Sequence, residues 1–193
     1  MTDRMGGVVR SVNVGRPRPL PGRPDHVSGI DKRPLDGPIQ LRDPGDKRTG
    51  LGSGVVGDHV HERRHHGGTD QAVYAVAREE LDHWGEVLGR ELRDGMFGEN
   101  LTTAGFDVDA ALVGEVWRIG DVVRLQVTGP RIPCETFAAQ MGEQRWVRRF
   151  TERGRTGAYL RVLAPGEVRA GDSVVVADRP DHDVTVPVMF RAL

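Results

Sequence analysis

The chain has almost no cysteine: its 193 residues contain one, Cys134. A single thiol excludes an internal disulfide and fits a reducing compartment such as the cytoplasm. Long apolar runs are also missing, since none approaches the ~20 apolar residues that a membrane helix requires. Residues 1–15 lack the apolar segment of a secretory signal. The sequence therefore predicts a cytoplasmic, soluble protein with no membrane partner.

The chain also lacks an excess of positive charge. Its formal net charge is -1 at pH 7, so nucleic acid is not expected to be its main partner. All but two of the 27 lysine and arginine residues are arginine, whose planar guanidinium binds carboxylate and phosphate with paired hydrogen bonds. Composition bias accounts for most of these arginines. The length and the hydrophobic fraction of 37% are typical of one domain with one substantial core.

The residues around Cys134 have the pattern of a strand that gives way to a helix. Alternating apolar and polar residues predict a half-buried strand over 122–128. Pro130 and Pro133 then interrupt any pairing, and helical spacing of apolar residues begins at Phe137. Cys134 is thus predicted on a rigid turn at the mouth of a sheet. Two interpretations stay open: a functional thiol, or a buried cysteine that acts as a small hydrophobic residue.

Hydrophobic periodicity over the whole chain predicts a strand-dominated α+β fold with a few helices. Segments with a period of two predict strands at 8–14, 38–42, 115–119, 122–128, 158–163 and 168–177. Residues 69–88 place apolar side chains on one face of a helix that ends at Gly89. Residues 143–153 predict a second amphipathic helix with Gly154 as its C-cap. Four prolines between positions 16 and 24 predict a loop there.

Two short motifs suggest chemistry but lack the context that each requires. Residues 52–57 match the dinucleotide-binding pattern G-x-G-x-x-G, which needs a hydrophobic strand before it and a helix after it. Neither element is predicted here. His61, Glu62 and His65 form H-E-x-x-H, which on a helix would bind zinc with the glutamate as general base. A glycine pair at 67–68 would end such a helix at once, so a zinc-dependent hydrolase is kept only as an alternative.

Other stretches carry polar groups suited to a ligand. His65 and His66 precede the predicted start of the helix over 69–88, where free amides favour an anion or an oxo group. Capping or core hydrogen bonds are the other interpretation of these histidines. The asparagine and threonine side chains within 94–103 have the groups to hydrogen-bond a heterocycle. Lys32, in a loop-rich region, is a candidate anion ligand, with a solvated loop as the alternative.

Taken together, six stretches resemble, in order, the MOSC domain family, which is named for the C-terminal part of molybdenum-cofactor sulfurases. The resemblance is greatest to its stand-alone bacterial branch, which includes hydroxylaminopurine reductases, and it covers roughly residues 8–178. The stretches are GLGSGVVGD at 50–58, HHGG at 65–68, GMFGENLTT at 95–103, PRIPC at 130–134, GAYLRV at 157–162 and AGD at 170–172.

The resemblance implies a barrel-like β-sheet domain over residues 1–178, with residues 179–193 as an extension that begins a small helical module. It implies a molybdenum–pterin cofactor with Cys134 as metal ligand and catalytic residue, since a coordinated thiol is deprotonated. Asn100 and Thr102 are then expected on the pterin, and Arg131 or Lys32 near its phosphate. The full set of expected cofactor-binding residues is Lys32, His65, His66, Gly98, Glu99, Asn100, Thr102 and Arg131.

The function that the resemblance implies is reduction of N-hydroxylated compounds such as hydroxylaminopurines or amidoximes. The cofactor would perform the redox chemistry, with electrons from a separate flavin or iron–sulfur protein. A non-catalytic carrier of the cofactor or of sulfur is the alternative, because it would use the same cysteine. The chain is too short to hold the pyridoxal-phosphate domain of the sulfurases. The sequence leaves the oligomeric state open, with a dimer as one option.

Overall fold

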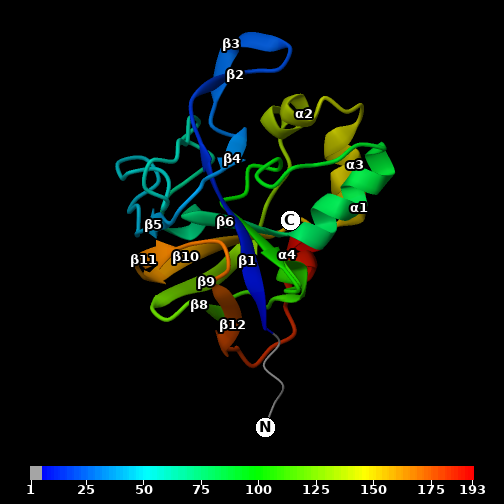
Figure 1. Cartoon of the computed structure of the whole chain (residues 1–193). Helices are drawn as coiled ribbons and strands as arrows, with labels where there is room; N and C mark the ends of the chain where they lie inside the picture. Colours follow the sequence, from blue (N-terminus) through cyan, green and yellow to red (C-terminus); the bar gives the residue numbers. More distant parts are fainter. Residues whose placement is uncertain (1–5) are drawn as a thin grey trace.

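The computed structural model describes residues 6–193 as a β-barrel with helices packed on its outside (Figure 1). The strands are β1 (Gly6–Gly15), β2 (Arg18–Leu20), β3 (Arg23–Ser28), β4 (Lys32–Pro34), β5 (Ile39–Leu41), β6 (Val73–Ala77), β7 (Leu101–Ala104), β8 (Val116–Ile119), β9 (Val123–Pro130), β10 (Ala158–Ala164), β11 (Gly166–Val168) and β12 (Ser173–Asp178). The helices are α1 (Arg78–Leu88), α2 (Glu135–Met141), α3 (Trp146–Arg153) and α4 (Val186–Ala192), with 3₁₀ turns η1 (Thr69–Gln71) and η2 (Val108–Ala110). The predicted α+β class with a barrel-like sheet is confirmed.

The barrel closes through its first and last strands. Its order is β12-β8-β9-β10-β6-β7-β1, and β1 pairs back onto β12 to complete the ring. The β6–β7 pair is parallel, whereas its neighbours in the ring pair antiparallel. The long strand β1 pairs in turn with β12, β7 and β4 along its length, and it crosses the barrel as the dark blue ribbon in Figure 1.

Alternating side chains fill the barrel interior, as the period of two predicts. In β9, Val123, Leu125 and Val127 are buried in the main core, while Arg124 points to solvent. The inward residues of the other barrel strands join the same cluster. Each fully buried aliphatic side chain of this kind contributes about 1.5–3 kcal/mol of transfer free energy. The strand predicted before Cys134 is therefore confirmed, and it ends at Pro130.

The helix predicted over 69–88 is wrong in its first half. Residues 73–77 form the barrel strand β6, and the helix α1 begins only at Arg78. Every residue of β6 is buried: Val73 and Ala75 face the barrel core, and Tyr74 and Val76 face a second cluster outside it. A strand that is buried on both faces is apolar throughout, so its sequence does not show the alternation that separates a strand from a helix.

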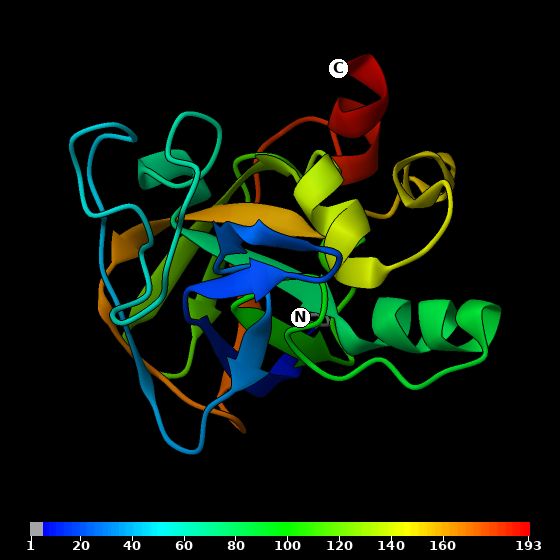
Figure 2. The same ribbon diagram turned by 90° about the horizontal axis from the view of Figure 1, so that it is seen from above.

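The prediction of a loop between positions 16 and 24 is also wrong. Strands β2 and β3 pair antiparallel there and form a hairpin apart from the barrel sheet. Its prolines are tolerated because both strands are edge strands. The hairpin lies beside α2 (Figure 2), and Arg23 of β3 contacts Glu135 of α2 at 3.4 Å.

A second core of aromatic side chains lies outside the barrel, under α1, α2 and α3. It contains seven of the ten aromatic residues of the chain if the partly buried Tyr159 is included. Phe97, Phe137 and Phe150 meet at near-perpendicular angles with ring centroids 5.0–5.7 Å apart, an arrangement that favours aromatic pairs. Cys134 packs against this cluster. Gly154 ends α3 in the left-handed conformation with φ 68°, as predicted.

The segment after β12 returns to the barrel. Helix α4 is capped by the side chain of Thr185, which accepts a hydrogen bond from the amide of Val188. Val186 is fully buried in the main core. Among residues 6–193, no helix has the length and apolar character needed to cross a bilayer.

Candidate functional site

A pocket opens at one end of the barrel, between the hairpin side of the molecule and the start of α2. It contains Cys134 together with residues from widely separated parts of the chain. The lining residues are His26 to Ile30, Lys32, Ser53, Asp58 to Glu62, His66, Gly67, Gln71, Ala72, Tyr74, Gly98, Asn100, Arg131, Cys134, Thr136 and Tyr159. Of the predicted binding residues, the fold thus brings Lys32, His66, Gly98, Asn100 and Arg131 to Cys134.

Cys134 occupies the N-cap position of α2, with extended backbone angles. The side chain is half-buried between the pocket and the aromatic cluster. Burial opposes ionisation of the thiol, but a hydrogen bond with His66, the charge of Arg131 and the amide of Phe137 outweigh it. Together they lower the pKa of Cys134 to about 6. At neutral pH the group is therefore a thiolate, which is the form that binds a metal or acts as a nucleophile.

Arg131 is a buried cation beside this thiol. Its side chain follows the end of β9 and is 4% exposed, and its Nη1 donates to the carbonyl oxygen of Phe97 at 2.7 Å. The guanidinium carbon lies 4.1 Å from the Phe137 ring centroid and 5.2 Å from that of Tyr74. Among the described residues no carboxylate pairs with Arg131, and the groups that favour its charge are Tyr74, Tyr159 and Cys134.

Asp58 is the centre of the polar network in the floor of the pocket. Its side chain is 1% exposed, and its oxygens lie 2.5 and 2.6 Å from the Lys32 amine. The same carboxylate accepts hydrogen bonds from the Ser53 hydroxyl at 2.8 Å, the Asn100 amide at 3.1 Å and the Gly15 backbone amide at 2.7 Å. Lys32 therefore lines the pocket with its charge already paired to Asp58.

Asn100 lines the pocket, but most of its hydrogen-bonding capacity is used within the protein. Its amide nitrogen donates to Asp58 and, at 3.3 Å, to the carbonyl oxygen of Asn13. Its amide oxygen accepts from the backbone of Tyr74 at 3.3 Å. The remaining acceptor capacity of this oxygen is what Asn100 can offer to a ligand.

Glu99 and Thr102, which the sequence placed at the cofactor, lie behind the pocket and do not line it. Glu99 is fully buried and accepts from the amides of Gly95 at 2.5 Å and Phe97 at 3.0 Å, and from the Thr102 hydroxyl at 2.9 Å. Burial raises the pKa of Glu99 to about 7 despite these bonds. Glu99 and Thr102 therefore hold the loop that carries Gly98. The buried carboxyl group of Glu99 accepts several hydrogen bonds from this loop, and these bonds keep the donor groups in place.

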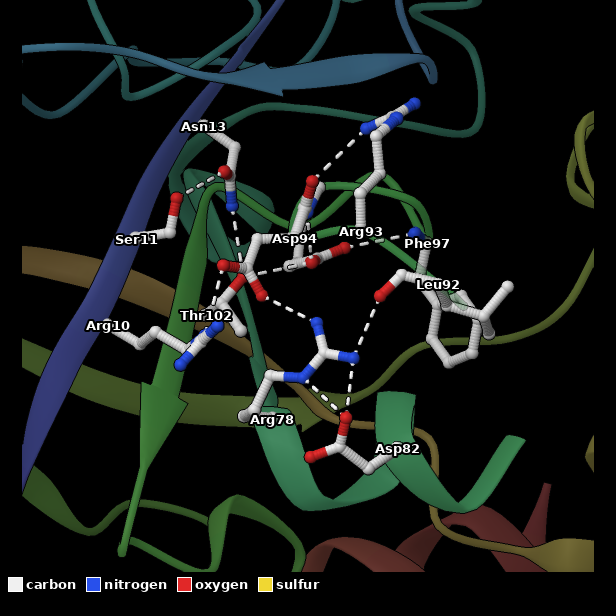
Figure 3. A network of polar contacts seen from close by, with 12 residues as sticks. Arg10, Ser11, Asn13, Arg78, Asp82, Leu92, Arg93, Asp94, Phe97 and Thr102 are labelled. Atoms are coloured by element: carbon white, nitrogen blue, oxygen red, sulfur yellow. Dashed lines mark hydrogen bonds and ion pairs between the residues drawn. The ribbon is translucent and has the colours of Figure 1, made fainter. Parts of the chain in front are cut away.

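The same loop is anchored from its outer side by a network of ionic side chains (Figure 3). Arg78 at the start of α1 donates to Asp94 at 2.8 Å, to Asp82 at 2.6 Å and to the carbonyl oxygen of Leu92 at 2.8 Å. Arg10 of β1 contacts the other oxygen of Asp94 at 3.1 Å. These contacts tie the loop before Gly98 to both the helix and the barrel.

The two histidines of the predicted pair separate in the structure. His66 lines the pocket and helps to lower the pKa of Cys134, whereas His65 is exposed and does not line it. The expected position at a helix start is wrong, since η1 and then β6 follow. Residues 61–65 are turn rather than helix, so H-E-x-x-H does not present two imidazoles on one helix face. Within residues 6–193 no three histidine, cysteine or acidic side chains form a metal-binding group.

The G-x-G-x-x-G stretch does not form a dinucleotide-binding turn. Residues 52–57 run through a loop in which Val55 makes one isolated bridge to Leu41, and no helix follows. Its contribution to the pocket is Ser53, which holds Asp58.

Three buried polar atoms in the pocket wall have no hydrogen-bond partner among the described residues: Arg131 Nε, His59 Nε2 and Gln71 Oε1. Buried polar groups are nearly always paired, so this set of a cation, an imidazole and an amide oxygen indicates a polar ligand. A thiolate supplies a soft metal ligand on the same wall. The residues present therefore fit a molybdenum–pterin group bound through Cys134.

Several residues of the site were not predicted from the sequence. Asp58 was part of a recognised stretch, but nothing in its sequence context indicated its pairing with Lys32. Tyr74 was predicted on a helix, and Tyr159 belongs to a recognised stretch, but neither was proposed as a pocket residue. His59 lies in a loop and Gln71 at the end of η1, and their proximity to Cys134 arises only in the folded chain.

Comparison with known proteins identifies the class of domain. Residues 62–175 match the MOSC domain family, and this span is more than half of the chain. The chain therefore belongs to the MOSC domain family. It is 33% identical over 184 residues to the Uncharacterized protein YflK of Bacillus subtilis (strain 168). This alignment covers 95% of this chain and 79% of YflK. It is 29% identical over 162 residues to the Protein YiiM of Escherichia coli (strain K12), covering 82% of this chain and 67% of YiiM.

A third relative is a longer protein. The chain is 31% identical over 177 residues to a protein named Reductase from Gibberella moniliformis, covering 90% of this chain and 30% of that protein. Among solved structures, YiiM from Geobacillus stearothermophilus matches with a TM-score of 0.74 and 26% identity over 95% of this chain and 81% of that one. These matches agree with the barrel described above and support an oxidoreductase-like role of the MOSC type.

Proposed function

We propose that this chain binds a molybdenum–pterin cofactor through the Cys134 thiolate and reduces N-hydroxylated compounds of the hydroxylaminopurine or amidoxime type. The observation that carries the proposal is the setting of Cys134, a thiol with its pKa lowered to about 6 on the wall of a pocket that holds three unpaired polar atoms. Family membership and the likeness to a protein named Reductase support the class of reaction.

In this proposal each pocket residue has a physical task. The cofactor, when bound, supplies the two-electron redox chemistry. His66 and Arg131 keep Cys134 in the thiolate form that a soft metal requires. Arg131, with a free Nε in the pocket wall, offers a cation to an anionic part of the ligand. Asp58 fixes Lys32, Ser53 and Asn100 in one arrangement, so that the floor of the pocket is formed before the ligand arrives.

The proposal includes partners outside this chain. In this proposal, electrons come from a separate flavin or iron–sulfur protein. With one cysteine, the chain fits the reducing conditions of the cytoplasm.

The test is the molybdenum and pterin content of the protein isolated from cells that make the cofactor. Wild type and Cys134→Ser are compared, with Ser53→Ala as a pocket variant that keeps the thiol. We expect about one molybdenum per wild-type chain and none in Cys134→Ser. Equal molybdenum in the two proteins would contradict the assignment of Cys134.

Turnover separates the enzyme from the carrier alternative. The loaded protein receives reduced methyl viologen as electron donor and 6-hydroxylaminopurine or benzamidoxime as substrate. Loss of the N-hydroxy compound with formation of the amine or amidine supports the reductase. Bound molybdenum without reduction of either compound would instead favour a carrier of the cofactor or of sulfur.

A further inference from the structure

Reduction of an N-hydroxy compound consumes protons, and the pocket must supply them. The N–O bond breaks, two electrons come from the external flavin or iron–sulfur reductant, and two protons are taken up. One proton goes to the nitrogen and the other to the oxygen, which leaves as water. A positioned side chain that exchanges protons near neutral pH accelerates such a step.

Three imidazoles line one side of the pocket. His26 lies on β3, and His59 and His61 lie on the loop after Asp58. The ring centroids of His59 and His61 are 5.8 Å apart, and those of His26 and His61 are 6.3 Å apart. His26 and His61 are exposed, whereas Nε2 of His59 is buried in the pocket wall without a partner among the described residues. The cluster thus leads from solvent into the pocket.

The backbone holds His59 firmly. Its amide donates to the carbonyl oxygen of Gly15 at 3.1 Å. Gly29 packs so closely on it that a Cβ at position 29 would lie 2.1 Å from the carbonyl oxygen of His59. The backbone that carries this ring is therefore held in place on both sides.

The charges around His59 favour the neutral ring. Burial is the largest cause that lowers the pKa of His59 below its usual value of 6.5, and the charges of His61 and Lys32 lower it further. Asp58 raises this pKa but does not outweigh them. His26 and Glu62 are the other titratable groups at this side of the mouth. A neutral imidazole can accept a proton on one nitrogen while it donates from the other.

The other titratable groups of the pocket are less suited to this task. The Lys32 amine is bound to Asp58, and burial raises the pKa of Tyr74 and Tyr159 away from neutrality. His66 is engaged with Cys134.

We infer that His59 is a catalytic residue that passes protons from solvent, through His61 and His26, to the N-hydroxylated substrate. This inference rests on the proposed function and extends it to the proton path. His61 and His26 act as positioning residues on the solvent side.

The experiment compares the loaded wild type with His59→Gln and His61→Gln, using reduced methyl viologen and 6-hydroxylaminopurine. His182→Gln, at an exposed site before α4, is the matched control. For His59→Gln we expect kcat to fall about 100-fold, with KM and molybdenum content unchanged and partial rescue by added imidazole. The wild-type kcat should rise as the pH falls through the His59 pKa, and this limb should be absent in His59→Gln.

A second readout does not depend on activity. In the cofactor-free protein, ¹⁵N-histidine NMR follows the titration of His59, and His61→Gln should raise its pKa by removing the neighbouring ring that lowers it. An unchanged His59 titration would overturn the coupling of the two rings. If wild type is active and His59→Gln has the same kcat, the proton path is wrong although the reductase stands. If wild type reduces no N-hydroxy compound, it is the proposed function that fails.

Discussion

Arg131 donates a hydrogen bond to the carbonyl oxygen of Phe97 at 2.7 Å, and this contact joins the turn that carries Cys134 to the loop that carries Gly98. The two segments are far apart in sequence, and each supplies one wall of the pocket. The buried guanidinium therefore has two effects: it connects the walls, and it places positive charge beside the thiol.

Replacement of Arg131 by glutamine should raise the pKa of Cys134 above its value of about 6, because the charge that favours the thiolate is removed. Glutamine retains a donor for the Phe97 carbonyl. The rate of alkylation by iodoacetamide as a function of pH measures the change. Arg124→Gln, at an exposed position of β9, is the control, and an equal thiol pKa in both variants would disprove the electrostatic role.

Asp58→Asn should destabilise the protein by about 3–5 kcal/mol, the usual result when one partner of a buried ion pair is removed and the other stays charged. The Lys32 side chain is 8% exposed and cannot escape to water without moving. Chemical denaturation measures the loss. Adding Lys32→Met to Asp58→Asn should recover part of it, and a double variant that is less stable than Asp58→Asn would refute this account. Asp25→Asn, at an exposed site, serves as control.

The pH dependence of stability should reveal Asp109. Burial raises the pKa of this carboxyl from 3.8 to about 6, although the Gly157 amide and Arg155 oppose the shift. Because the folded state binds the proton more tightly, the stabilisation is complete below pH 3.8 and is lost as the pH rises through 6.

Asp109→Asn removes this titration while it keeps an acceptor for the Gly157 amide, which lies 3.0 Å from the carboxylate. Between pH 4 and 7 the wild type should therefore lose about 2–3 kcal/mol relative to Asp109→Asn. Thermal unfolding at a series of pH values measures the difference. Parallel curves for the two proteins would rule out the shift, and Asp121→Asn at an exposed turn provides the reference.

Gly98→Ala should weaken both the fold and the pocket. Gly98 has φ 83°, and a Cβ there would lie 2.9 Å from Cγ1 of Ile30, another pocket residue. Gly22→Ala is a close control, because Gly22 also has a positive φ, 71°, but its Cβ would meet no atom within 4 Å. We expect about 1–3 kcal/mol of destabilisation from Gly98→Ala and a lower molybdenum content, with a smaller loss and normal content in Gly22→Ala. Equal losses of stability and cofactor would exclude the clash.

Much of this architecture could be predicted from local sequence. The strand before Cys134, the helix after it and the glycine that ends α3 follow from alternation, helical spacing and a C-cap. Strand β6 could not, since Tyr74 and Val76 face a second core and remove the polar face that identifies a strand. The prediction of a loop after β1 was wrong because prolines are excluded only from central strands, and β2 and β3 are edge strands.

The residues of the site likewise divide into those that the sequence could predict and those that it could not. Cys134, Arg131 and His66 were predicted because they belong to recognisable stretches, and all three line the pocket. Glu99 and Thr102 belong to such a stretch too, yet they serve to hold the loop from behind. A sequence motif reports that a segment is constrained, but whether a side chain faces the ligand or the core depends on how the segment is turned in the fold. The pairing of Asp58 with Lys32 joins two segments that are 26 residues apart. Because no short sequence pattern marks such a pair, it could not be predicted.

The closure of the barrel has a consequence for how the protein is made. Gly6 and Gly7 pair with Val175 and Val174, so the ring cannot be completed during synthesis until β12 has left the ribosome. Until then β1 and its neighbours expose unpaired edges, and contacts of such large sequence separation form slowly. The pocket, whose walls come from both early and late segments, is therefore assembled late.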